Sequence, residues 1–583
     1  MRRGRLARRT TSLGKLGVWF GIFSALSAGL ANCGSGEASS DTEAGGGNST
    51  GGRGAGGSAA GGSAGDDGAG ATPSYGGDDS VEPTYGRFGE GPESTFALPA
   101  ANANGELYYP DVIASFPEVN FSTLDRLYVA AGEYRTILLG NLPERTLERP
   151  LVITNLGGQV KVGGRAANYV MSLGGGKNWI LTGRYDPISK TGDAEFRGHA
   201  EGAYAHSQGS YGFFIDDAFS KEGLTGLSIG SKATDFELDC VEVARAEFAG
   251  IVAKTDNDGS ATMKNVKVHD LYIHDTGSEG IYFGSTQQQP QHAFEHLHIY
   301  DNRFLRTGTE AIQIGQQGDG LEVHHNVFGP GAVRWRSAFQ QYQDGNVQYG
   351  QRYGSGAFHH NVVVGTGDLF VEFFPTVVEG DPHSASDKVS FTDNYFSDSS
   401  SSGVYTHADD TGVTIEFLRN VFRGFRFNYD SVYPDAKPPV QVFGVGANTP
   451  NPHLLIDNVA ESTFPFLLYT FPSVTESNNT NAEVPPVEFR DFMLPELEAD
   501  LRKLEWWTPT ATLSPDMRAV AYEVGAVVVH QGALYRALAQ STGKPPDENA
   551  DVWQVLPDPA DDVRLAPGSP HQGLGVRWPP AQP

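Results

Sequence analysis

Two glutamates at corresponding places in a repeated segment are the first residues whose spacing could support chemistry. Glu279 stands in GSEGIYFG and Glu310 in GTEAIQIG, and the two segments superpose when Ile281 is aligned with Ile312. Carboxylates about 5 Å apart have the spacing of a retaining glycosidase pair. Their mutual repulsion would raise the pKa of one of them. The alternative is that both sit at a turn, where they accept backbone N–H bonds or pair with arginine.

A lysine followed by an acidic turn suggests a second kind of chemistry. Lys254 ends the aligned segment AEFAGIVAK, and Asp256 and Asp258 follow it with the spacing of half a calcium loop that lacks its distal glutamate. A calcium ion here would depress the pKa of Lys254 and make it a better base, as a polysaccharide lyase requires. The alternative is a surface lysine before a solvated turn. No other cofactor is indicated.

A histidine and aspartate cluster follows in VHDLYIHD, from Val268 to Asp275. His274 could act as a general acid or base, because its pKa lies near neutrality. The alternative is a salt bridge, since Asp275 aligns with Arg306 one repeat later. The spacing between His269 and His274 matches no specific zinc pattern.

The stretch 329–356 breaks the repeat and is rich in arginine and aromatic residues. Aromatic rings stack on sugars, and guanidinium groups bind carboxylates in a bidentate manner. The sequence therefore predicts substrate-binding residues in this loop, unless the loop packs on its own coil. The predicted residues are Arg334, Trp335, Arg336, Tyr342, Arg352 and Tyr353.

A sequence repeat must position these side chains. A short apolar strand leads to a polar pair that often ends in Asn, and a second apolar strand and a Gly-containing turn follow. Repeats of this length predict a solenoid of strands. We interpret the repeated Asn as a turn residue that adopts the left-handed conformation and bonds to backbone along the stack. These residues are Asn302, Asn326, Asn361, Asn394, Asn420 and Asn458.

The first repeats carry a family resemblance. LDRLYVAAGEYRTILLG and RPLVITNLGGQVKVGG resemble the first coils of pectate-lyase-like right-handed parallel β-helix proteins, and the resemblance extends over roughly residues 105–480. It implies an all-β, single-stranded right-handed parallel β-helix of about a dozen coils over residues 86–484. The scaffold is shared by lyases, hydrolases, epimerases and adhesins, so it implies a polysaccharide partner and leaves the reaction open.

A small module follows a connecting segment, 485–517. Residues 518–558 resemble the chitin-binding type-3 carbohydrate-binding family, with Tyr522, Tyr535 and Trp553 at family positions. The family often carries aromatics where this chain has Ala539 and Gln540, so these three rings must supply any stacking face; otherwise they form the core. Residues 559–583 contain DDVRLAPGSP, which resembles the closing strand of bacterial β-helix proteins and predicts that the module is inserted before a final coil.

The first residues are predicted to be a targeting segment. Residues 1–32 combine a basic start with an apolar run and end before Cys33, which resembles a bacterial lipoprotein signal with Cys33 as the lipidated residue. Cleavage by a general signal peptidase and a membrane anchor are the alternatives. The Gly- and Ser-rich residues 33–85 are predicted to be a flexible tether. We expect export, either with a lipid anchor at the cell envelope or surface or as an extracellular protein.

Composition limits the classes of function. The formal net charge of −28 argues against nucleic acid as a partner, because binding phosphates needs basic surface. Cys33 and Cys240 are the only cysteines, so no disulfide framework exists, and Cys240 is predicted to be a buried core residue. We expect a monomer that binds and degrades extracellular polysaccharide, as a lyase or a glycoside hydrolase. The alternative is a non-catalytic carbohydrate-binding or adhesion solenoid at the cell surface.

Overall fold

Three parallel sheets wind around one core in the computed structural model, which describes residues 93–163, 169–183, 211–218, 224–254, 261–284, 292–337, 343, 345–375, 378–407, 412–425, 441–445, 451–461, 465–467, 472–512 and 519–577. The predicted signal segment, tether and Cys33 lie outside the described residues, as do Asp256, Asp258 and Tyr342. Within the described part of the chain, no helix is long and apolar enough to span a membrane.

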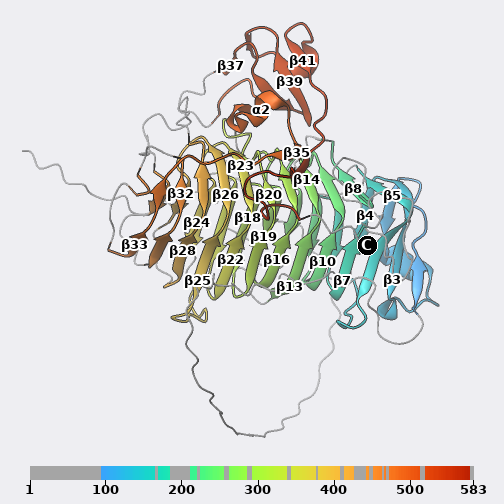
Figure 1. Cartoon of the computed structure of the whole chain (residues 1–583). Coiled ribbons are helices and arrows are strands. Elements are labelled where there is room, and N and C mark those ends of the chain that lie inside the picture. Colours follow the sequence, from blue (N-terminus) through green and yellow to red (C-terminus); the bar gives the residue numbers. More distant parts are fainter. Residues whose placement is uncertain are drawn as a thin grey trace, which may run out of the picture. The chain divides into compact units, whose positions relative to one another are not determined.

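The first sheet starts each coil, and its strands pair in parallel with those of the coils before and after it (Figure 1). Its strands are β1 (Thr95–Ala97), β3 (Arg126–Tyr134), β5 (Leu151–Val162), β7 (Lys177–Thr182), β10 (Thr234–Asp239), β13 (Thr262–His269), β16 (Ala293–Tyr300), β19 (Leu321–His324), β22 (Ser355–His359), β25 (Lys388–Thr392), β28 (Thr414–Leu418), β31 (His453–Ile456) and β33 (Val474–Ser477).

The second sheet follows after a tight corner, and the last parts of β3 and β5 also belong to it. Its other strands are β8 (Phe213–Asp216), β11 (Val241–Ala244), β14 (Tyr272–His274), β17 (Arg303–Leu305), β20 (Val327–Phe328), β23 (Val362–Thr366), β26 (Tyr395–Ser399), β29 (Val421–Arg423), β32 (Val459–Ala460) and β34 (Thr480–Asn481).

The third sheet completes the coil. Its strands are β2 (Glu106–Tyr108), β4 (Thr136–Leu139), β6 (Tyr169–Gly174), β9 (Thr225–Gly230), β12 (Ile251–Ala253), β15 (Ile281–Phe283), β18 (Ile312–Gln317), β21 (Val347–Gln351), β24 (Val371–Pro375), β27 (Val404–Thr406) and β30 (Phe443–Val445). The fold class predicted from the sequence, an all-β right-handed parallel β-helix of about a dozen coils with a small C-terminal β module, is confirmed.

Alternation along each short strand builds the core. In β15, Ile281 and Phe283 point inward and join the continuous apolar core, whereas Tyr282 lies on the opposite face. The register pairs Ile281 with Ile251 on one side and with Ile312 on the other, as the sequence alignment predicts. Equivalent residues of successive coils therefore lie one strand spacing apart, about 4.8 Å.

The corner between the first two sheets is built on a ladder of asparagines. The side-chain oxygen of Asn394 accepts hydrogen bonds from the backbone N–H and the Nδ2 of Asn361, both at 3.0 Å. The same Nδ2 of Asn361 donates to the carbonyl of Val323 at 2.9 Å. This pattern repeats along the stack, and the asparagines from Asn302 to Asn458 are fully buried, so the predicted bonding along the stack is confirmed.

The left-handed residue of this corner is not the asparagine, and that part of the prediction is wrong. The residue before each asparagine has the positive φ, as at Asp301, His325, His360 and Asp393, each with φ of 55°. The asparagine itself must keep its side chain pointing inward along the stack to bond to the next coil. The preceding residue therefore makes the turn.

The C-terminal part departs from the predicted boundaries. The module's sheet has the order β36 (Leu504–Trp506), β38 (Val527–His530), β39 (Ala533–Ala537), β41 (Trp553–Val555), so it begins inside the predicted connecting segment. The pair β37 (Ala521–Tyr522) and β40 (Ser541–Thr542) adds a second small sheet. Strand β42 (Asp562–Leu565) pairs antiparallel with β35 (Phe489–Asp491) and adds no coil, so the predicted closing coil is wrong.

Short helices connect these parts. Helix α1 (Tyr109–Ser115) follows β2, and the turn of 3-10 helix at Phe121–Thr123 comes next. Helix α2 (Pro495–Glu498) and the 3-10 turn at Leu501–Lys503 lead into β36, and another turn at Pro546–Glu548 lies within the module.

A buried ion-pair network fixes the final segment to the second sheet. The guanidinium of Arg306 binds Asp275 from the preceding coil at 2.8 Å and Asp561 from the final segment at 2.8 Å. Tyr272 also donates to the Asp561 carboxylate, and Arg303 donates to the Asp561 carbonyl at 2.6 Å. Cys240 is 7% exposed and packs in the same outer apolar cluster, which confirms that it is buried but not that it faces the interior.

We expect the Asn361→Ala substitution to lower the free energy of unfolding by about 3 kcal/mol, because two buried donors of Asn326 lose their acceptor. Chemical denaturation followed by circular dichroism measures this change. Asn479→Ala is the matched control: Asn479 ends the ladder, is only partly buried and can be replaced by water. Equal losses from both substitutions would contradict the importance of the buried ladder.

Candidate active site

A row of polar side chains runs along the outer face of the third sheet. Strand register stacks Tyr282 on Gln313, Gln313 on Gln348 and Gln348 on Glu372. They point outward because their neighbours in each strand fill the core. Each of the four is at most 8% exposed. The third sheet therefore carries a polar layer that is nearly closed to solvent, which is unusual for groups with hydrogen-bonding capacity.

Glu279 and Glu310 lie immediately before this row, at the ends of the turns that enter β15 and β18. The backbone N–H of Gly280 donates to the carbonyl of Glu310 at 2.9 Å, which fixes the two glutamates on adjacent coils as predicted. Both side chains are 1% exposed. The Nε2 of Gln343 donates to Oε1 of Glu279 at 3.3 Å. Among the described residues, Oε2 of Glu279 and both carboxylate oxygens of Glu310 have no hydrogen-bond partner.

Burial makes these carboxyl groups hard to ionise. It raises the pKa of Glu279, although the nearby positive charge of Lys254 acts in the opposite direction. Burial also raises the pKa of Glu310 well above its usual range, and the charge of Glu279 raises it further. Burial therefore favours the protonated form of both carboxyl groups, and most strongly that of Glu310. Among the described residues, no arginine pairs with the Glu310 carboxylate, whose two oxygens have no hydrogen-bond partner of good geometry.

Lys254, which the sequence assigns to a separate set of candidate residues, lies close to this group. Its Nζ lies 3.3 Å from the centroid of the Tyr282 ring, so a cation and a phenol lie side by side at the same end of the row. Charge complementarity between a cation and an aromatic face stabilises such a contact. The base predicted for lyase chemistry is therefore next to the predicted acid pair.

Glu372 and His407 extend the row and were missed by sequence reasoning. The Nε2 of His407 lies 2.9 Å from Oε1 of Glu372, and the His407 ring stacks on Phe374 at 4.0 Å. Glu372 contributes to the raised pKa of Glu310. Extending the repeat alignment from Tyr282 and Gln313 to VEFFP would have found Glu372, because it occupies the same outward position.

His274 lies elsewhere, on the second sheet. Its Nδ1 is 2.7 Å from Asp275, and its Nε2 is 3.3 Å from Glu242, with all three side chains buried. Burial alone would lower the pKa of His274, but the two carboxylates raise it to about 9. The imidazole is thus a cation in the network that contains Arg306, as the salt-bridge alternative predicts, and not a group poised to exchange protons with a substrate.

The predicted sugar-binding loop is not one loop. Strand β21 occupies part of it and belongs to the third sheet. Arg352 binds Asp381 at 2.8 Å, and the hydroxyl of Tyr353 donates to Glu295 at 2.9 Å. Both side chains are 8% exposed and are held by these partners, so the prediction that they bind a sugar is wrong.

Arg334, Trp335 and Arg336 instead form the junction with the C-terminal part. Arg334 donates to the carbonyl of Gly277 at 2.7 Å, and Arg336 binds Glu505 at 2.5 Å. The backbone N–H of Trp506 donates to the carbonyl of Val333 at 2.6 Å, so this segment anchors β36. A hollow at the junction is lined by Trp335, Arg336, Glu496, Leu497, Asp500, Arg502, Lys503, Glu505, Glu523, Gly525, Ala526 and Val527.

The aromatic rings of the module are mostly core. Tyr522 is 1% exposed and bonds through its hydroxyl to the backbone of Thr508, and Trp553 is 2% exposed and donates to the carbonyl of Lys544 at 3.0 Å. They cannot present a stacking face, so that prediction is wrong for both. Tyr535 is only partly buried at the edge of the same cluster. It remains the one predicted ring with an accessible face among the three.

Comparison with known proteins finds only solved structures that resemble this chain distantly. No protein-family model matches the chain, and no curated protein sequence matches it either. Similar solved structures include the lacto-N-biosidase of family GH136 from Eubacterium ramulus, at 12% identity and a TM-score of 0.34, covering 62% of this chain and 62% of that one. The chain thus spans less than two thirds of that relative's length. Its likeness to this protein carries no inference about activity.

Two further structures have similar levels of likeness. The alginate lyase from Paenibacillus sp. str. FPU-7 has 14% identity and a TM-score of 0.31, covering 67% of this chain and 99% of that one. The pectate lyase Pel9A has 10% identity and a TM-score of 0.30, covering 66% of this chain and 80% of that one.

The Glu310→Gln substitution is expected to stabilise the protein at neutral pH. The folded-state pKa of Glu310 is raised, so the wild type loses stability as pH rises above the unfolded value of about 4.3, and the neutral amide avoids this loss. We expect a melting temperature about 2 °C or more above the wild type at pH 7, and no gain near pH 4.

Thermal denaturation across this pH range measures the difference. Glu416→Gln is the control, because Glu416 is satisfied by Lys388 and by the hydroxyl of Ser390. A loss of stability for Glu310→Gln at both pH values would mean that Glu310 is an ordinary satisfied acceptor.

Proposed function

We propose that the chain is an exported polysaccharide-processing enzyme, a glycoside hydrolase that uses Glu279 and Glu310 on the outer face of the third sheet. The observation that carries the proposal is the stacked pair itself. Two buried carboxyl groups on adjacent coils have three oxygens without a hydrogen-bond partner among the described residues. Leaving such groups unsatisfied destabilises a fold, so a use at a ligand accounts for them better than a structural role does.

The two carboxyl groups have different environments, as an acid and a nucleophile require. Glu310 is the proton donor to the glycosidic oxygen, because burial and the neighbouring charge raise its pKa. Glu279 is the carboxylate that attacks the anomeric carbon, because Lys254 favours its ionised form. A backbone strand spacing of about 4.8 Å allows the two side chains to reach the carboxyl separation of about 5–5.5 Å found in retaining enzymes. The expected product therefore retains its anomeric configuration.

The row beyond the pair suits an extended glycan. Tyr282, Gln313 and Gln348 lie on successive coils, and a glycan in this row would have to displace what now buries them before it could contact the ring and the amides. The repeat of the sheet thus supplies equivalent polar groups at regular spacing along one direction. The Nε2 of Gln343 donates to Oε1 of Glu279. A sugar hydroxyl bound between the two glutamates would donate to Glu279 in place of this amide.

A lyase is the second candidate, and the contact between Lys254 and Tyr282 favours it. In β-elimination, Lys254 would remove the proton next to a uronate carboxylate and Tyr282 would protonate the leaving oxygen. Calcium at Asp256 and Asp258 would then neutralise the uronate. The alternative class, a non-catalytic binder, requires only the row and the module, in which Tyr535 is the partly exposed ring.

Incubation of the exported chain with chitin, pectin, alginate and glycosaminoglycans, with and without calcium, tests the proposal. New reducing ends without an unsaturated product indicate hydrolysis, and ultraviolet absorbance of an unsaturated sugar indicates elimination. We expect Glu310→Gln and Glu279→Gln to lower kcat by about 100-fold to 10,000-fold, and Lys254→Met to have a smaller effect.

Addition of azide is a second test. Azide acts as an external nucleophile and restores turnover of a retaining enzyme that lacks its own nucleophile. We expect azide to rescue Glu279→Ala but not Glu310→Gln acting on substrates with ordinary leaving groups. Glu416→Gln serves as the control on another sheet and keeps full activity. Binding without cleavage on every polysaccharide would support the non-catalytic solenoid, and a total loss with Lys254→Met alone would support the lyase.

A further inference from the structure

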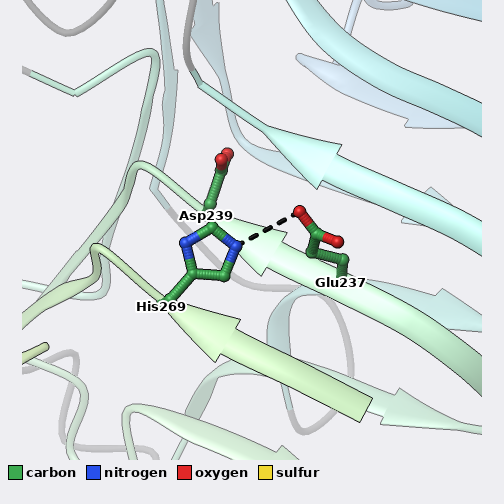
Figure 2. A group of neighbouring side chains, drawn as sticks. All are labelled: Glu237, Asp239 and His269. Atoms are coloured by element: carbon green, nitrogen blue, oxygen red, sulfur yellow. Dashed lines mark hydrogen bonds and ion pairs between the residues drawn. The ribbon is translucent and has the colours of Figure 1, made fainter. Parts of the chain in front are cut away.

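A second group of ligand-type side chains lies on the outer side of the first sheet, away from the third-sheet site. Glu237 and Asp239 stand two residues apart on β10, and His269 stands on β13 of the next coil, paired in register with Asp239 (Figure 2). Each of the three offers one ligand atom, and these atoms lie within 4.8 Å of one another. The side chains converge because residues two apart on a strand share a face.

All three side chains are buried, with exposures of 3% for Glu237 and 0% for both Asp239 and His269. The Nε2 of His269 faces Oε1 of Glu237 at 3.2 Å, the contact that Figure 2 marks. Carboxylate and imidazole groups held this close, out of water, form a small chelating set with atoms from two coils.

The imidazole is held in the orientation that a metal ligand needs. Its Nδ1 lies 2.8 Å from the carboxylate of Asp270, which leaves Nε2 directed at the group. The Tyr300 ring stacks on the imidazole at 4.6 Å with an angle of 6° between planes, which fixes the ring plane. A ligating histidine whose other nitrogen bonds a carboxylate is the common outer arrangement at metal sites.

The neighbouring histidine shows what the same motif looks like when it is only an ion-pair network. His274 also lies between two carboxylates, Glu242 and Asp275. There, however, the guanidinium of Arg306 binds Asp275 at 2.8 Å and supplies a permanent positive charge. At His269 a third carboxylate, Asp239, takes part in the group instead.

Negative charge accumulates around the His269 group. The carboxylate of Asp270, which faces Nδ1 of His269, adds a third negative charge to those of Glu237 and Asp239. Lys267 approaches Glu237 at 3.7 Å and is one counter-charge. A divalent cation at the group would offset more of this negative potential than a single ammonium does.

We propose that Glu237, Asp239 and His269 bind a divalent transition-metal ion of the zinc type, which links two successive coils of the β-helix. An imidazole ligand favours zinc over calcium or magnesium, which prefer oxygen ligands throughout. Three protein ligands leave a further coordination position for water. The site is structural in this proposal and independent of the carboxylate pair on the third sheet.

Isothermal titration of the chelator-treated full chain with zinc chloride tests the site directly. We expect one equivalent of zinc to bind and to raise the melting temperature, because a ligand that binds the folded state stabilises it. Asp239→Asn preserves shape while weakening a ligand, and should weaken zinc affinity by about 100-fold or more. His269→Gln should have a similar effect. Calcium chloride should bind much more weakly at this site.

His274→Gln is the matched control, because it removes a histidine flanked by two carboxylates without touching the proposed ligands. It should lower stability while leaving zinc stoichiometry and affinity unchanged. The melting temperature of each variant without metal separates a folding defect from a loss of binding.

Two outcomes would overturn the proposal. One is the absence of zinc binding to the folded wild-type chain, which would make His269 a plain buried ion pair. The other is binding that survives Asp239→Asn and His269→Gln but disappears with His325→Ala and His360→Ala, because the hydrogen-bonded pairs His324–His325 and His359–His360 are the rival imidazole donors.

Discussion

The parallel hydrogen-bonded register between successive coils is the constraint on which the rest of this structure depends. It places Ile281 between Ile251 and Ile312 in the core and, by the same geometry, Glu279 beside Glu310 outside it. A register that is fixed for packing therefore also fixes the backbone spacing of outward residues, at about 4.8 Å per coil. Any like pair of charges that recurs in the repeat becomes a close pair, and its electrostatic cost follows from the fold.

The three sheets deal with buried charge in different ways. On the second sheet, Arg306 binds both Asp275 and Asp561. Burial alone would raise the pKa of Asp275, but Arg306 and His274 hold it at about 2. On the third sheet, Glu310 has no such partner among the described residues, and its pKa is raised. On the first sheet, the group around His269 combines carboxylates with an imidazole. Buried charges that are paired with opposite charges stabilise the fold. Buried carboxyl groups that lack such a partner are candidates for binding a ligand.

The final segment shows how the outside of a solenoid becomes a second core. Residues such as Tyr272, Leu305 and Val327 point away from the coil interior, yet the C-terminal part covers them with its own apolar side chains. Asp561 then enters among them and binds Arg306, while Arg336 and Glu505 tie the module to the same region. The module and the final segment are thus attached through specific polar contacts on an apolar face, not as further coils.

The sequence by itself determined the repeat and everything that follows from its period. It identified the β-helix, the coil-to-coil alignment of Glu279 with Glu310 and of Asp275 with Arg306, and the bonding of the repeated asparagines along the stack, because neighbours along the stack are about one repeat apart in the chain. Only the tertiary structure decided which face each side chain occupies and what covers it. Residues 334–336 lie at the junction with the C-terminal part, and Tyr522 and Trp553 belong to the core of the module. Arg306 binds Asp561, which follows it by 255 residues in the chain. Such contacts depend on how segments that are distant in the chain pack against the coils. The repeat in the sequence carries no information about that packing.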